Sequence, residues 1–278
     1  MAILSDHSIG WLLALALSLV TTGIIAGIMA GLLGVGGGIV IVPVLYHLFT
    51  LLGIDEAVRM HVAVGTSLAT IIPTSIMSSR SHFKRGSLDP ALLKQLIPGV
   101  IVGVILGAVL SGYASGVELT AVFATIALLV ALNMAFKKDG FSIRDGLPGP
   151  IGTGIIAFFI GGISTLMGIG GGTLSVPVLS AFKTPMIRAV GTGAALGLVI
   201  SLPGAIGFLI NGMGVENRPP LSVGYVNLIG LALIVPATMF MAPKGARLAH
   251  AINAKRLRQL FALFLLITSI RMFYGLIY

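Results

Sequence analysis

Two stretches of this chain decide how the rest of it is interpreted: GLLGVGGGIVIVPVL at residues 31–45 and TLMGIGGGTLSVPVL at residues 165–179. Each contains a glycine triplet followed, after the same interval, by VPVL. Two further blocks recur in the same order along the chain. The tetrapeptide AVGT ends at Thr66 and again at Thr192, and GAVLSGYASGVELTAVFA from Gly107 aligns without gaps with GARLAHAINAKRLRQLFA from Gly245. Three matching blocks in one order predict an internal duplication.

The composition places both copies in a membrane. Of 278 residues, 56% are hydrophobic and 9% are charged, whereas a soluble domain carries roughly a quarter charged residues. The mean hydropathy is +1.09. These values predict an all-α polytopic membrane protein with the lipid bilayer as its surroundings. The net charge of +9 then fits cytoplasmic loops rich in lysine and arginine, so we expect no nucleic-acid partner.

Spanning segments follow from the apolar runs, because a helix needs roughly 20 apolar residues to cross a bilayer. Two shorter apolar segments, at 39–52 and 173–182, each come directly after a glycine triplet, and we expect partial crossings there. Eight long runs remain, at residues 11–33, 61–79, 91–113, 117–136, 151–167, 189–210, 222–242 and 257–277.

The chain therefore divides into a first membrane repeat at residues 1–136, a polar linker rich in glycine and proline at 137–150, and a second repeat at 151–278. Each repeat holds five apolar segments. If all five change sides, the second copy is inserted upside down, which is the inverted-repeat plan of many secondary transporters. The parity is the same if each glycine-broken pair is a re-entrant hairpin, because both ends of that pair then stay on one side.

The positions of the basic residues give the orientation. With the N-terminus outside and the segments alternating, 13 of the 17 basic residues fall on the inside, and only Arg59, Arg218 and Arg271 lie clearly on the outside. Because cytoplasmic loops collect lysine and arginine, both termini are predicted to be periplasmic. The 13 inside residues are Arg80, Lys84, Arg85, Lys137, Lys138, Arg144, Lys183, Arg188, Lys244, Arg247, Lys255, Arg256 and Arg258.

The glycine triplets are the predicted binding site. Glycine has no Cβ and adopts positive φ at low cost, so backbone N–H groups can approach a ligand. The N-terminus of the helix that follows attracts anions without any basic side chain. In an inverted pair the two helix starts would converge near the middle of the membrane. The alternative is that these glycines only allow close helix packing. The residues are Gly36, Gly37 and Gly38 in the first copy and Gly170, Gly171 and Gly172 in the second.

Hydroxyl groups lie next to this predicted site in the sequence. Thr66 and Thr192 end the AVGT segments, and Ser67 and Thr70 follow the first of them. Their hydroxyls would either complete the anion's shell or bond to the carbonyl one helical turn back. Pro43 and Pro177 follow their glycine triplets at equal intervals, and each is expected to end or kink its short helix.

Several classes of function are disfavoured by residues that the chain lacks. It has no cysteine, and its five histidines show no paired spacing, so we expect no disulfide, no metal site and no cofactor. No GxSxG, HExxH or paired carboxylates lie in the apolar runs, which argues against an enzyme. No acidic residue sits clearly at mid-membrane, so no proton relay is visible. The identity of a coupling ion, proton or sodium, stays open.

The repeated G-x-GGG and VPVL, the AVGT segments and the closing GARLAHAINAKRLRQLFALFLLITSIRM resemble the sulfite exporter TauE/SafE family of bacterial inner-membrane permeases. The resemblance covers essentially the whole chain. It implies about eight spanning helices and export of anionic sulfur compounds such as sulfite and organosulfonates. It also matches the two glycine triplets and the AVGT threonines to the family's motifs.

We therefore expect a transporter that carries a small sulfur-containing anion, sulfite first and a short sulfonate second, by alternating access. Two other interpretations stay open. One is a permease for a different small anion, such as thiosulfate or a carboxylate, that uses the same backbone site. The other is a membrane scaffold that transports nothing.

Overall fold

The structure is a computed structural model that describes residues 9–136, 144–249, 251 and 254–277. Helices make up most of the described chain, which also contains one two-stranded antiparallel hairpin. In chain order the elements are α2 (Ile9–Leu33), α3 (Gly38–Leu51), α4 (Glu56–Lys84), α5 (Pro90–Ser111), α6 (Gly116–Phe136), α7 (Pro150–Met167), α8 (Gly172–Ala181), α9 (Met186–Asn211), β1 (Ser222–Val223), β2 (Val226–Asn227), α10 (Leu228–Leu248) and α11 (Ala254–Ile277).

The predicted class, an all-α polytopic membrane protein, is confirmed. Seven helices in the described chain are long and apolar enough to cross a membrane: α2, α4, α5, α6, α7, α9 and α10. The eighth predicted span corresponds to α11, which has 24 residues, and its apolar stretch within the described residues is Ala262–Leu276. The two segments after the glycine triplets form the short helices α3 and α8.

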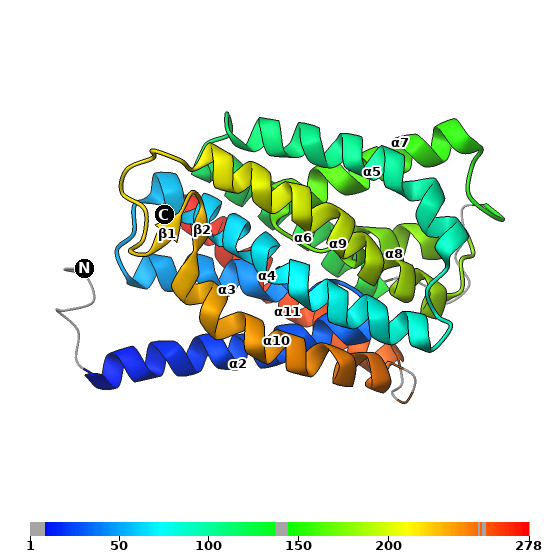
Figure 1. The fold of residues 1–278 in the computed structure, drawn as a ribbon, viewed down its shortest axis with the longest axis horizontal. Helices are drawn as coiled ribbons and strands as arrows, with labels where there is room; N and C mark the ends of the chain where they lie inside the picture. Colours follow the sequence, from blue (N-terminus) through cyan, green and yellow to red (C-terminus); the bar gives the residue numbers. More distant parts are fainter. Residues whose placement is uncertain (1–8, 137–143, 250, 252–253, 278) are drawn as a thin grey trace.

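Neither short helix crosses a bilayer. Helix α3 has 14 residues and α8 has 10. At 1.5 Å per residue they are about 21 and 15 Å long, against about 30 Å of hydrocarbon. Both start in the middle of the molecule and run toward opposite ends, α3 to the left and α8 to the right (Figure 1). The first long helix begins and the last one ends at the left-hand end, so the described chain enters and leaves on one side.

Helices α4 and α9 form the centre, and the other long helices pack around them. The apolar windows of these two helices are the most buried of the seven, and the helices pack against each other. Helices α2 and α10 pack together on one flank and α5 and α7 on the opposite flank (Figure 1). Helix α6 packs against α11. This set of contacts is unchanged when the two halves of the chain are exchanged; the duplication itself stays a prediction.

Glycines at four-residue spacing explain the tight flanking pairs. On α2, Gly23, Gly27 and Gly31 face α10 so closely that a Cβ on Gly27 would lie 2.8 Å from the Cα of Thr238. On α5, Gly99, Gly103 and Gly107 face α7 in the same way. Small residues at such spacing let helix backbones approach in membranes, where no hydrophobic effect drives helices together.

The starts of three long helices are fixed by polar side chains. Asp55 caps α4 by accepting from the N–H of Ala57, and Asp89 caps α5 by accepting from Ala91 and Leu92. Asn227 caps α10 by accepting from Gly230. Such side chains pair N–H groups that have no partner inside the helix.

Two expectations about element ends are wrong. Helices α3 and α8 continue past Pro43 and Pro177, the sixth residue of each, so neither proline ends its helix, although each lacks the N–H that would bond one turn back. The run predicted as a helix from residue 222 begins instead with the β1–β2 hairpin, and α10 starts only at Leu228. Gly224 in the turn has a φ of +54°, which a helix does not contain.

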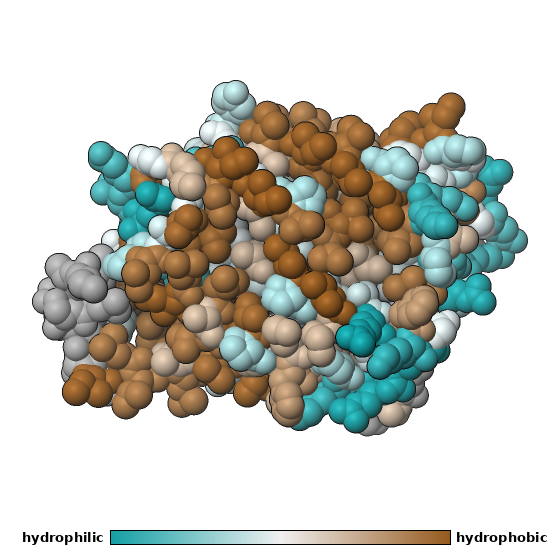
Figure 2. Space-filling view, viewed as in Figure 1, coloured by the Kyte–Doolittle hydropathy of each residue, from teal (hydrophilic) through white to brown (hydrophobic). Residues whose placement is uncertain are grey.

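The outer surface is that of a protein in lipid. Large apolar side chains are exposed along the outward faces of the flanking helices, among them Leu17 on α2, Val102 on α5 and Phe159 on α7. In Figure 2 a broad hydrophobic band covers the middle, and hydrophilic residues gather at the ends, most densely at the right-hand end. The right-hand end carries the C-terminus of α4 and the N-terminus of α9, with Lys84 and Arg188 exposed there.

Candidate functional site

The two glycine triplets meet at the centre of the molecule. A Cβ on Gly36 would lie 3.0 Å from the Cα of Gly170, and a Cβ on Gly170 would lie 2.8 Å from the Cα of Gly36. On either side of this contact, a Cβ on Gly38 would overlap the carbonyl of Gly168, and one on Gly172 would overlap that of Gly34. The two breaks therefore cross in antiparallel fashion with Gly36 and Gly170 in contact, whereas Gly37 packs against Ala26 of α2 and Gly171 against Leu196 of α9.

Backbone conformation adds a second requirement for glycine at the breaks. The φ angles are +69° at Gly34, +72° at Gly36, +82° at Gly37 and +66° at Gly168. Residues with a Cβ rarely adopt such angles. Close packing and positive φ together explain these glycines even without a ligand, so the packing alternative accounts for part of the pattern.

The crossing places two helix N-termini back to back. Helix α3 leaves it toward the end where α2 begins, and α8 leaves it toward the basic end (Figure 1). Within the described chain, no hydrogen bond is formed by the N–H groups of Gly36, Gly37, Gly170 or Gly171. Unpaired N–H groups and the positive ends of two helices thus converge in an apolar interior, which is an arrangement suited to an anion.

The predicted hydroxyls do not all reach the crossing. Ser67 does, since its Oγ donates to the carbonyl of Gly168 at 2.7 Å. Thr66 and Thr192 instead accept from the backbone N–H groups of Asn227 (2.8 Å) and Asp89 (3.3 Å), which are the cap residues of α10 and α5. Neither threonine makes the bond to the preceding helical turn that was the alternative. Thr70 does, since its Oγ1 donates to the carbonyl of Thr66 at 2.9 Å.

Five buried hydroxyls that the sequence analysis passed over lack a partner in the described chain: Ser75, Ser164, Thr173, Ser175 and Ser201. Thr173 and Ser175 lie in the first turn of α8, directly after the second glycine triplet. The signal was visible in the sequence, because TLS follows the second triplet where IVI follows the first. The described residues contain no cluster of three or more side chains suited to a metal ion.

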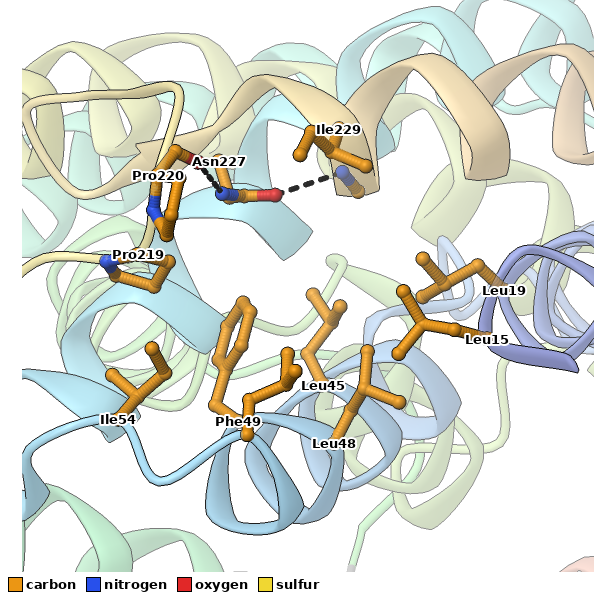
Figure 3. A pocket seen from close by; sticks show the side chains of 12 residues that line it. Leu15, Leu19, Leu45, Leu48, Phe49, Ile54, Pro219, Pro220, Asn227 and Ile229 are labelled. Atoms are coloured by element: carbon orange, nitrogen blue, oxygen red, sulfur yellow. Dashed lines mark hydrogen bonds between the residues drawn. The ribbon is translucent and has the colours of Figure 1, made fainter. Parts of the chain in front are cut away.

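Two pockets flank the crossing, one toward each end. The first lies among α2, α3 and the start of α10, and it holds only about 40 Å³ of space for water. Its wall is apolar: Leu45, Leu48 and Phe49 of α3 point into it, with Leu15 and Leu19 on one side and Pro219 and Pro220 on the other (Figure 3). Asn227 closes the upper side, donating to the carbonyl of Pro220 at 3.0 Å and accepting from Gly230 at 2.9 Å.

The second pocket lies among α5, α7, α8 and the start of α9, at the basic end, and holds about 780 Å³. Two ion pairs line it, Lys183 with Asp145, and Arg188 with Asp89, the latter at 3.8 Å. When the two halves are aligned on their repeated blocks, the pockets correspond. Leu19, Leu48 and Asn227 in the first pocket match Thr153, Phe182 and Asp89 in the second.

Comparison with known proteins matches residues 19–272 to the family described as sulfite exporter TauE/SafE. A "probable membrane transporter protein" of Haemophilus influenzae is 32% identical over 253 residues, which is 90% of this chain and 95% of that protein. The "probable membrane transporter protein YunE" of Bacillus subtilis is 29% identical, over 92% of this chain and 96% of its own. A similarly described protein of Methanocaldococcus jannaschii is 30% identical, over 86% and 88%.

No solved structure matches the chain. The family match covers nearly all of both halves and confirms the resemblance carried by the repeated glycine motifs. With seven candidate spans and relatives described as membrane transporters, the chain belongs to the sulfite exporter TauE/SafE family of membrane transport proteins.

Proposed function

We propose that this protein exports a small sulfur-containing anion, sulfite or a short organosulfonate, across the bacterial inner membrane. One observation carries the proposal: two helix starts and their unpaired N–H groups meet at the glycine crossing, in the middle of an otherwise apolar bundle. N–H groups fixed in a water-excluded interior can replace the hydration shell of an oxoanion. In this role the glycines bind, while Ser67 supports the crossing.

Alternating access is the proposed route of transport. The two pockets flank the crossing on opposite sides and are lined by corresponding segments of the two halves, yet one is nearly closed and the other is wide. Rocking one half against the other would close the wide pocket and open the narrow one. The anion would then reach either side of the membrane without an open channel.

The test is counterflow of labelled sulfite into proteoliposomes that contain the purified protein, with sulfate, thiosulfate, sulfoacetate, taurine and acetate as competitors. We expect uptake that sulfite and short sulfonates inhibit best. Strong inhibition by acetate or thiosulfate would redirect the proposal to a permease for those anions. No uptake of any labelled anion would leave only a scaffold role.

The proposed orientation places both termini in the periplasm and the basic end in the cytoplasm. Most basic residues outside the apolar runs fall at that end, as the distribution of lysine and arginine in cytoplasmic loops predicts. A reporter enzyme that works only in the periplasm should be active when it is fused after Tyr278, and one that works only in the cytoplasm should be inactive there. After Arg144, a reporter enzyme that works only in the cytoplasm should be active, and one that works only in the periplasm should be inactive. The opposite result at both positions would show that the chain is inserted with the reverse orientation.

A further inference from the structure

The two halves of the glycine crossing are not equivalent, and the difference indicates where a ligand would bind. Aligning the two glycine motifs pairs Thr173 with Ile39 and Ser175 with Ile41. Helix α8 therefore starts with two hydroxyl side chains where α3 starts with two isoleucines. All four side chains are buried, with exposed fractions of 0 to 2%. Only the second helix start offers hydrogen-bond donors beyond its backbone.

The residues of α4 and α9 that cover the starts of α3 and α8 differ as well. Over the first triplet lies Ile71 of α4, whose side chain lies 3.0 Å from a Cβ on Gly36 and 2.8 Å from one on Gly38. Aligning the AVGT segments pairs Ile71 with Gly197 of α9. The first triplet is thus covered by the branched side chain of Ile71. At the matching position over the second triplet α9 has Gly197, next to Leu196, whose Cβ also lies against Gly171.

A hydroxyl occupies the position that Gly197 leaves free. Of the neighbours of a Cβ built on Gly197, the nearest is the Oγ of Ser75, and the N atom of Gly171 lies 3.7 Å away. One helical turn earlier on α9, a Cβ on Gly193 would lie 3.0 Å from the Oγ of Ser175 and 2.8 Å from the Cα of Gly172. Glycines of α9 therefore bring hydroxyls next to the start of α8.

These hydroxyls have unused hydrogen-bonding capacity. The side-chain oxygens of Ser75, Thr173 and Ser175 are buried and form no hydrogen bond within the described chain. Buried polar groups in folded proteins nearly always have partners, so hydroxyls that lack one call for an explanation. The N–H groups of Gly170 and Gly171 beside them are unpaired as well. All these groups can donate, and an oxoanion offers only acceptors.

We propose that the transported oxoanion binds at the start of α8, held by the N–H groups of Gly170 and Gly171 and the hydroxyls of Ser75 and Ser175. The start of α3 is then a packing partner covered by Ile71, and it binds no anion. This inference rests on the proposed function, because it assigns the anion to one half of the glycine crossing. It also explains why a duplicated motif carries hydroxyls in one copy only.

The test is calorimetric titration of the purified protein in detergent with sulfite, using chloride as the comparison anion. Ser75→Ala and Ser175→Ala are each expected to weaken sulfite binding about tenfold, since each removes one hydrogen bond to a charged ligand. Neither variant should lower the melting temperature, because the hydroxyl that it removes has no partner in the protein. Loss of binding with full stability is the signature of a ligand contact.

Two control variants make the test specific. Ser78→Ala, on the same helix as Ser75, removes a buried hydroxyl that donates to the carbonyl of Ala30, and it should lower stability but not affinity. Ile71→Val trims the cover of the first triplet and should also leave sulfite affinity unchanged. If both serine variants bind like the unaltered protein, or if Ile71→Val weakens binding as much as they do, the assignment to α8 is wrong.

The same titration separates this inference from the proposed function. If the unaltered protein binds neither sulfite nor any sulfonate, the proposed function fails and this assignment fails with it. If the unaltered protein binds sulfite and the serine variants do so equally well, the function stands and only the assignment of the anion to α8 is overturned.

Discussion

At Gly37 the backbone φ is +82°, and a Cβ would lie 2.8 Å from the carbonyl oxygen of Ala26. Gly53 shares the left-handed conformation, with a φ of +66°, but nothing lies within 4 Å of its Cβ position. The two glycines therefore separate the cost of positive φ from the cost of crowding. At the crossing both costs apply, which is why a substitution there is expected to be severe.

Gly53→Ala should destabilise the fold by about 1–2 kcal/mol, the usual cost of placing a Cβ in the left-handed region. Gly37→Ala should cost about 2–5 kcal/mol, because overpacking adds about 1–3 kcal/mol to the same φ term. Unfolding in detergent by heat or denaturant measures both variants. Equal losses would mean that the crossing relaxes to accept a methyl group, and close packing would then not explain the glycine triplets.

Thr66 and Thr192 show how far a residue's role can lie from its local sequence. Both lie near the start of a run predicted to span the membrane, which suggested an anion shell or a bond to the preceding turn. In the structure Thr66 lies well inside α4, which begins at Glu56. Their actual partners, the N–H groups of Asn227 and Asp89, lie 161 and 103 residues away in the chain. No local pattern predicts such a pair, because the contact depends on how α4 and α9 pack against the starts of α10 and α5.

Thr66→Val should therefore lower stability by about 1–3 kcal/mol, the usual cost of leaving a buried N–H group without its acceptor. Thr192→Val should cost less, because Asp89 is only half-buried and its bond is longer. Thr66→Ser should restore most of the loss. Thermal unfolding distinguishes this role from direct substrate binding, which would reduce anion affinity and leave the melting temperature unchanged.

At the scale of elements, the glycine rows on α2 and α5 set the distance between the flanking helices. Gly27 contacts α10 closely, whereas Gly10 on the same helix has nothing within 4 Å of its Cβ position. Gly27→Ala should separate α2 from α10 and cost about 1–3 kcal/mol. Gly10→Ala should be neutral or stabilise the helix by up to about 1 kcal/mol. Similar melting temperatures for the two variants would show that this helix pair is loosely packed.

Much of the element order was predictable, because hydrophobic length and glycine breaks act locally. All seven candidate spans in the described chain fall on predicted runs, and the short helices α3 and α8 begin at the glycine triplets as expected. The β1–β2 hairpin was missed because its residues continue the apolar run of α10. The hydroxyls of Ser75 and Ser175 were missed because nothing in a single helix shows that a side chain lacks a partner.

At the scale of the whole molecule, the two pockets are the feature that a duplicated chain explains best. Asn227 in one and Asp89 in the other occupy matching positions, and each caps a helix while its N–H donates to an AVGT threonine. The two pockets differ in volume, about 40 against 780 Å³, and such a difference is expected if the predicted repeats adopt different arrangements. Exchanging those arrangements would exchange the pockets.

The chain contains no cysteine, so single cysteines can report on each pocket without background labelling. Thr184→Cys, in the wide pocket, should react readily with a water-soluble thiol reagent, whereas Leu48→Cys, in the narrow one, should be protected. Saturating sulfite shifts the populations of the two arrangements only if it binds one arrangement more tightly than the other. Any sulfite-induced gain at Leu48→Cys must then accompany a loss at Thr184→Cys. Both sites gaining together would indicate a channel-like opening, and alternating access between the two pockets would be ruled out.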